Sequence, residues 1–140
     1  HMFLTAGYAK LDPQTGHLTY ADGGHNPALV FRAATRTVER LKPHGMLLGA
    51  FLEIACEELT AHLDAGDILL LYTDGITEAL NERQEEYGED RLMEMLAACA
   101  DQPAVEIRDA IVASVTAFAA GTPPADDLTL FVAKRRSGAR

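Results

Sequence analysis

A run of apolar residues enclosed by acidic turns is the feature that most constrains this chain. Residues 67–75 read Asp-Ile-Leu-Leu-Leu-Tyr-Thr-Asp-Gly, so the apolar stretch lies between Gly66-Asp67 and Asp74-Gly75. This pattern predicts a buried strand that ends in a tight turn. Asp74 can be only a turn residue, because Asp-Gly is a common turn dipeptide. A carboxylate at a rigid strand end can also hold a hard cation such as Mg²⁺ or Mn²⁺, and the turn alone does not decide between these roles.

The rest of the chain shows strand and turn patterns first and helical spacing later. Apolar runs and period-two alternation predict further strands at 3–11, 17–21, 28–32, 37–41, 54–63 and 128–133. Helical spacing predicts a short helix at 76–80, a second from 89 onward, and a third from Asp101, as its N-cap, to about 120. Six strands, then helices, then one closing strand predict the α+β class with antiparallel sheet.

Length and composition are those of a single domain. With 140 residues, 48% of them hydrophobic, the chain can bury a core, and no apolar run is long enough to span a bilayer. We therefore expect a soluble, cytoplasmic chain with no membrane contact in this segment. The formal net charge of -9 disfavours nucleic acid as a partner, because phosphate backbones are bound by basic surfaces. His1-Met2 is typical of a cloning scar, residues 3–134 form the expected domain, and residues 135–140 form a basic tail.

A second acidic turn, Asp126-Asp127, comes directly before the closing strand. If that strand is the antiparallel neighbour of the strand that ends at Asp74, the carboxylates of both turns lie at the same end of a sheet. Carboxylates this close repel each other unless a cation or a shared proton lies between them. A divalent ion would remove the repulsion and could lower the pKa of a bound water for hydrolysis. The alternative is that Asp126-Asp127 is simply a turn between helix and strand.

A loop rich in turn-forming residues, Asp22-Gly23-Gly24-His25-Asn26-Pro27, joins two of the predicted strands. His25 is therefore mounted between strands, where it can contact a ligand or serve a structural role. The pattern leaves both roles open. The chain contains no Gly-x-Ser-x-Gly elbow, Walker A loop or His-Glu-x-x-His helix, which removes three common catalytic classes.

Five motifs spread over almost the whole chain carry a resemblance to a known family. They lie at residues 21–27, 48–49, 67–79, 87–88 and 126–130. Two of them contain Tyr72-Thr73-Asp74-Gly75 and Asp126-Asp127-Leu128-Thr129. In content and order these motifs resemble those of bacterial SpoIIE/RsbU-type phosphatases, which belong to the metal-dependent PPM serine/threonine protein phosphatases.

The resemblance implies an antiparallel β-sandwich flanked by helices, with two Mn²⁺ or Mg²⁺ ions at one edge. A metal-bridging water would attack the phosphorus of phosphoserine or phosphothreonine directly. Carried over to this sequence, the family pattern makes Asp74 and Asp126 the catalytic metal ligands, with Gly75 and Asp127 beside them in the metal site and Asp127 assigned to positioning. The implied substrate and partner is a phosphorylated anti-sigma-factor antagonist. A phosphatase-like module that only docks signalling partners is the alternative function.

One departure from the family pattern concerns the start of the domain. The family's catalytic domain opens with a Gly-Asp-x-x-Asp type motif whose first aspartate bridges both metals, and no such motif precedes Phe3. We therefore expect an incomplete domain, the C-terminal part of a phosphatase domain, with weak or no metal binding and little activity alone. Strand edges left without partners would be covered by self-association, so we expect a homodimer of this fragment.

Overall fold

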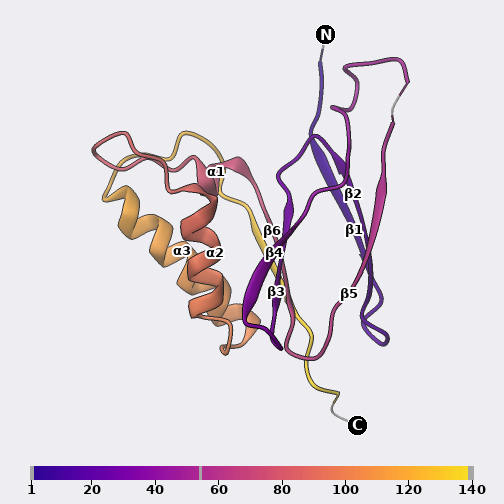
Figure 1. Cartoon of the computed structure of the whole chain (residues 1–140). Helices are drawn as coiled ribbons and strands as arrows, with labels where there is room; N and C mark the ends of the chain where they lie inside the picture. The colour runs from indigo at the N-terminus through magenta and orange to yellow at the C-terminus, as the bar shows by residue number, and fades with distance from the viewer. Residues whose placement is uncertain (1, 54, 139–140) are drawn as a thin grey trace.

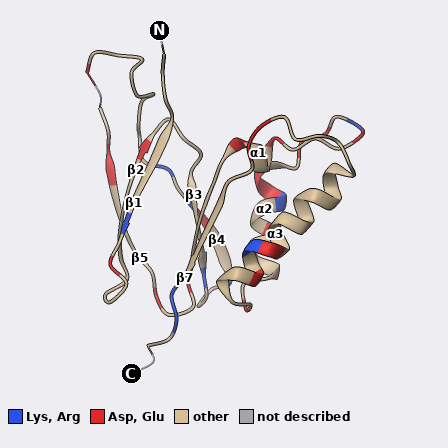
Figure 2. Cartoon of the chain, turned by 180° about the vertical axis from the view of Figure 1, so that it is seen from behind, with Lys and Arg blue, Asp and Glu red and all other residues tan. Residues whose placement is uncertain are grey.

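A three-stranded sheet, a four-stranded sheet and a group of helices form three layers in this structure, which is a computed structural model (Figure 1). It describes residues 2–53 and 55–138. Figure 2 shows the layers from behind, with the helices against the four-stranded sheet. His1, Ile54 and Arg140, predicted above to belong to the cloning scar, the fifth strand and the basic tail, lie outside the described residues.

All pairings between the strands are antiparallel. The strand order is β1-β2-β5 in the first sheet and β4-β3-β6-β7 in the second. The strands of the first sheet are β1 (Ala6–Leu11), β2 (His17–Gly23) and β5 (Glu58–His62). The strands of the second are β3 (Ala28–Arg32), β4 (Thr37–Leu41), β6 (Ile68–Tyr72) and β7 (Leu130–Lys134). The predicted α+β class, with an antiparallel β-sandwich flanked by helices, is confirmed.

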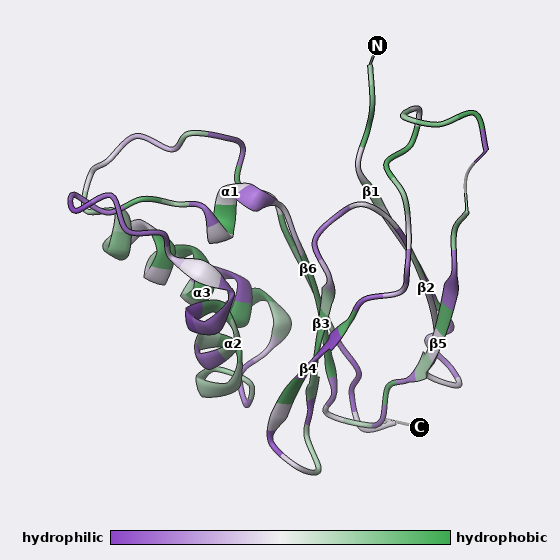
Figure 3. Ribbon diagram, turned by 45° about the horizontal axis from the view of Figure 1, so that its top comes forward, coloured by the Kyte–Doolittle hydropathy of each residue, from purple (hydrophilic) through white to green (hydrophobic). Residues whose placement is uncertain are grey.

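The second sheet is apolar on both faces because it is covered on both sides. In β3, Leu29 and Phe31 belong to the core shared with the helices, while Ala28 and Val30 belong to the core between the sheets. The residues of β6 divide in the same way. This explains why residues 68–72 form a continuous apolar run instead of an alternating one. Figure 3 shows the hydrophobic colour on both strands.

Three helices follow β6, namely α1 (Asp74–Thr77), α2 (Gly88–Ala98) and α3 (Ala104–Ala119). The helical spacing predicted for this segment is confirmed, since Ile107, Ile111 and Val115 lie on one face of α3 and are buried in the core shared with the second sheet. Phe118, at the end of this face, meets the ring of Tyr87 edge to face, with 5.4 Å between the ring centroids. No helix in the described part of the chain combines the length and the apolar character needed to cross a membrane.

Three of the predicted strands are too long at their N-terminal ends, and the closing strand begins at Leu130 instead of residue 128. The first begins at Ala6 instead of residue 3, because Leu4 leaves this ladder and forms an isolated bridge with Leu48. The fifth begins at Glu58 instead of residue 54, because Cys56 forms another isolated bridge with a preceding loop. In both places an apolar or alternating pattern continues beyond the strand, and contacts with a distant loop end the ladder.

The predicted boundaries of two helices also differ from the structure. The first helix starts at Asp74, two residues before the predicted start, and ends at Thr77. Asp101 is not the N-cap of α3, because Pro103 occupies that position. Asp101 instead accepts hydrogen bonds of 3.0 and 3.3 Å from the guanidinium of Arg36. An ion pair with a distant turn has replaced the predicted capping role.

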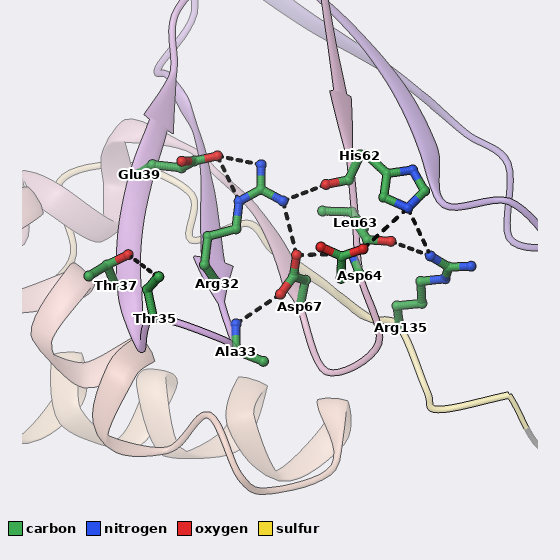
Figure 4. Close-up of polar contacts among 10 residues, drawn as sticks. All are labelled: Arg32, Ala33, Thr35, Thr37, Glu39, His62, Leu63, Asp64, Asp67 and Arg135. Atoms are coloured by element: carbon green, nitrogen blue, oxygen red, sulfur yellow. Dashed lines mark hydrogen bonds and ion pairs between the residues drawn. The ribbon is translucent and has the colours of Figure 1, made fainter.

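A buried ion pair fixes the point where the chain enters β6 (Figure 4). The Asp67 side chain accepts hydrogen bonds from Arg32 Nη1 at 2.9 Å, from the Ala33 N–H at 2.8 Å and from the Asp64 N–H at 3.0 Å. Arg32 also donates to Glu39. Since Asp67 is only 1% exposed, these bonds compensate the cost of burying its charge. The first residue before β6 is thus held by β3 and by the turn that precedes it.

Candidate metal centre

The strands that carry the two acidic turns are antiparallel neighbours. β6 pairs with β7, and the ladder continues at Thr73, whose N–H donates to the Thr129 carbonyl at 3.1 Å. The hydroxyl of Thr73 accepts from the Thr129 N–H at 3.1 Å and donates to the Asp127 carbonyl at 3.0 Å. The condition stated above for convergence is therefore met. Asp74 and Asp126-Asp127 follow and precede paired strands at one end of the sheet.

Gly75 marks the closest approach between the two turns. A β-carbon at this position would lie 2.3 Å from the Asp127 carbonyl oxygen and 3.3 Å from that of Asp126. The first distance is far below van der Waals contact, so a side chain at position 75 would force the turns apart. Glycine is required here by a close backbone approach. Its predicted membership of the metal site stays a prediction.

Three carboxylates are exposed at this end of the second sheet, those of Asp74, Asp126 and Asp127. None of them takes part in an ion pair within residues 2–53 and 55–138. Figure 2 shows acidic residues around α1. Carboxylate oxygens are the ligands that Mg²⁺ and Mn²⁺ prefer, so these three side chains have the right chemistry to bind either ion. Yet the described residues hold no group of three or more His, Cys, Asp or Glu side chains arranged for a metal ion, so the donors do not complete a site by themselves.

A polar network centred on His25 supports the same end of β6. The Nε2 atom of His25 donates to the Tyr72 carbonyl at 3.1 Å, and Nδ1 accepts from Thr5 Oγ1 at 3.3 Å. A carbonyl can only accept, which assigns the ring hydrogen to Nε2. The backbone N–H of His25 donates to the buried carboxylate of Asp22 at 2.6 Å. Of the two roles left open for this histidine, the structure shows the structural one.

The side chain of Tyr72 connects β6 to the start of α2. Its hydroxyl donates to Glu89 at 2.6 Å, and Glu89 also accepts from Arg40. Burial raises the pKa of Tyr72, and the hydrogen bond to the Glu89 carboxylate raises it further. Burial alone would raise the pKa of Glu89, but the hydrogen bonds from Tyr72 and Arg40 outweigh it and lower that pKa. The last residue of β6 is therefore anchored to the helical layer as well as to its sheet.

The family can now be assigned. Residues 1–136 match the family model described as Stage II sporulation protein E (SpoIIE). The chain therefore belongs to the SpoIIE family, and the predicted membership of the SpoIIE/RsbU-type PPM phosphatase domains is confirmed.

Two relatives and one solved structure illustrate the similarity. The chain is 31% identical over 134 residues to Protein IcfG of Synechocystis sp., covering 96% of this chain and 21% of that protein. It is 32% identical over 81 residues to Phosphoserine phosphatase RsbU of Bacillus subtilis, covering 58% of this chain and 24% of that protein. The SiaA-PP2C domain of Pseudomonas aeruginosa has a similar fold, with a TM-score of 0.82 at 24% identity, covering 96% of this chain and 52% of that chain. The chain thus spans less than a quarter of the length of these two relatives and about half of the solved domain.

Proposed function

We propose that this chain is part of a metal-dependent protein serine/threonine phosphatase in which Asp74 and Asp126 bind Mn²⁺ or Mg²⁺. The observation that carries the proposal is the pairing of β6 with β7, which brings both acidic turns to one end of the sheet. Family membership supports the same chemistry, and the relative RsbU bears the name phosphoserine phosphatase. Two bound ions would activate a water as nucleophile and neutralise charge on the phosphoryl group.

Each residue at this end of the sheet has its own task in the proposal. Asp74 and Asp126 offer carboxylate oxygens from two turns that Thr73 ties together. Gly75 permits the close approach of those turns. Asp127 orients the second ligand, because its backbone N–H donates to Asp126 Oδ1 at 2.7 Å. For Asp74, the end of β6 holds the ligand in place before the ion arrives.

The proposed substrate and partner is a phosphorylated anti-sigma-factor antagonist, so the protein would act in bacterial signalling. This part of the proposal rests on the family and not on the geometry of the site. The alternative function is a phosphatase-like module that docks signalling partners without catalysis. Asp74 and Asp126 are both present and close in the fold, which favours catalysis by the whole protein.

We also propose that these 140 residues alone turn over substrate poorly and associate as a homodimer. β1 and β7 are edge strands of their sheets, and an apolar groove lies between them. Tyr8 and Phe131, which line this groove, are more than half exposed. Bare strand edges beside apolar surface favour association. Light scattering tests the proposal, and a monomer at high protein concentration would contradict it.

The decisive experiment for the site is metal-dependent dephosphorylation of a phosphoserine protein by the full-length protein. We expect Asp74→Asn and Asp126→Asn to lose activity by more than about a hundredfold, since even groups that only support metal ligands are worth about 10- to 100-fold. Asp109→Asn is a matched control, because Asp109 is an exposed aspartate on α3 that pairs with its neighbour Arg108. If both site variants kept full activity, the assignment would be wrong.

A further inference from the structure

The ladder between β3 and β6 ends before the last residue of β6. Its last pair is Leu29 with Leu70, two residues before Tyr72. Thr73 directs its N–H toward β7, and the polar backbone groups of Tyr72 therefore point the other way, toward β3. The Tyr72 carbonyl therefore lies beyond the ladder hydrogen bonds between these two strands.

The imidazole of His25 supplies a hydrogen bond to this carbonyl. Its Nε2 lies 3.1 Å from the Tyr72 carbonyl oxygen. At the other ring nitrogen, Nδ1 accepts a hydrogen bond from Thr5 Oγ1 at 3.3 Å. The backbone N–H of His25 donates to the Asp22 carboxylate at 2.6 Å. His25 thus gives the Tyr72 carbonyl a side-chain donor that is held in place by its own hydrogen bonds.

We infer that His25 is a positioning residue for Asp74. The inference rests on the proposed function, because it takes Asp74 to be a metal ligand. Thr73, between Tyr72 and Asp74, is tied to β7 through its backbone and its hydroxyl. The hydrogen bond from His25 holds the peptide segment from the side of β3. The segment that carries the ligand is therefore held from the side of β7 and from the loop that precedes β3, and His25 acts on the metal only through it.

Amide hydrogen exchange on the 140-residue chain without metal tests the first step. His25→Ala should speed exchange at residues 72–76 by about tenfold, the effect of one hydrogen bond, and leave the buried amides of α3 unchanged. His25→Gln should keep most of the protection, because its amide can donate from nearly the position of Nε2. His17→Ala is the matched control, since His17 is an exposed histidine of β2. Unchanged exchange at 72–76 in His25→Ala would overturn the inference.

Metal binding by the full-length protein separates this inference from the proposed function. His25→Ala should weaken Mn²⁺ binding, followed by calorimetry, by about tenfold while KM for the phosphoprotein stays unchanged, as for other supports of metal ligands. If Asp74→Asn kept full Mn²⁺-dependent activity, the proposed function would fail. If Asp74→Asn were inactive but His25→Ala bound Mn²⁺ as tightly as the wild type, the inference would fail and the proposed function would stand.

Discussion

Replacing Asp67 with alanine should destabilise the chain far more than removing an exposed acid. The carboxylate is 1% exposed and accepts three hydrogen bonds, from Arg32 and from the backbone N–H groups of Ala33 and Asp64 (Figure 4). Alanine leaves both N–H groups without this acceptor at the start of β6. Arg32 keeps its contact with Glu39, so its charge is not left unpaired.

The size of the effect follows from these contacts. Removing one partner of a buried ion pair costs about 3 to 5 kcal/mol. The side chain of Arg32 is 23% exposed and keeps a second carboxylate, so we expect a value at the lower end of that range. With an unfolding entropy of about 2.1 cal/mol/K per residue, 140 residues give about 0.3 kcal/mol/K. A loss of about 3 kcal/mol then lowers Tm by about 10 °C.

Urea unfolding followed by circular dichroism measures this loss, provided that wild type and variant have similar m-values. Asp64→Ala is the matched control three residues away, because its carboxylate is 74% exposed and pairs with the exposed His62 at 3.4 Å. We expect this control to change the free energy of unfolding by less than about 0.5 kcal/mol. If Asp67→Ala and Asp64→Ala differed by less than about 1 kcal/mol, the argument from burial would be refuted.

Two further predictions concern the end of β6. Gly75→Ala should cost about 1 to 3 kcal/mol, because the new β-carbon would lie 2.3 Å from the Asp127 carbonyl oxygen. Thermal unfolding measures this cost against Gly138→Ala, where no atom lies within 4 Å, and equal Tm values would contradict it. The lowered pKa of Glu89 means that its contribution to stability is present above its ordinary pKa of 4.5 and is lost as the pH falls through the folded-state value. The stability difference between wild type and Glu89→Gln should therefore shrink between about pH 7 and about pH 3, and a constant difference in urea unfolding would contradict this.

Most of the fold could be predicted because turn residues bound the apolar runs clearly. β3 and β4 coincide with the predicted strands at 28–32 and 37–41. Errors arose where a distant partner competed with a local preference. Asp101 has the side chain of an N-cap, yet Arg36, 65 residues away in sequence, takes its carboxylate. Local pattern cannot show such a partner.

The candidate site could be predicted only in part, for a related reason. Asp74 and Asp126 were identifiable as acids next to strands, and the condition for their convergence could be stated. Whether it was met depended on the pairing of β6 with β7 across all three helices. The role of His25 was harder to see, since its partner is the Tyr72 carbonyl, 47 residues away in sequence. Only the fold brings the two groups together.

The two proposed ligands differ in how firmly the protein holds them. Asp74 directly follows a segment fixed by the His25 ring, by the Thr73 backbone and by the Tyr72 side chain. Asp126 lies in residues 121–129, which have no regular ladder and contact the strand end through Thr73 and through the close approach at position 75. An ion that bridges both turns would therefore order the second more than the first. In the full-length protein, added Mn²⁺ should slow amide exchange more strongly at 125–129 than at 72–76. Equal slowing in both segments would mean that the end of β6 is no better organised before metal binding than the turn it faces.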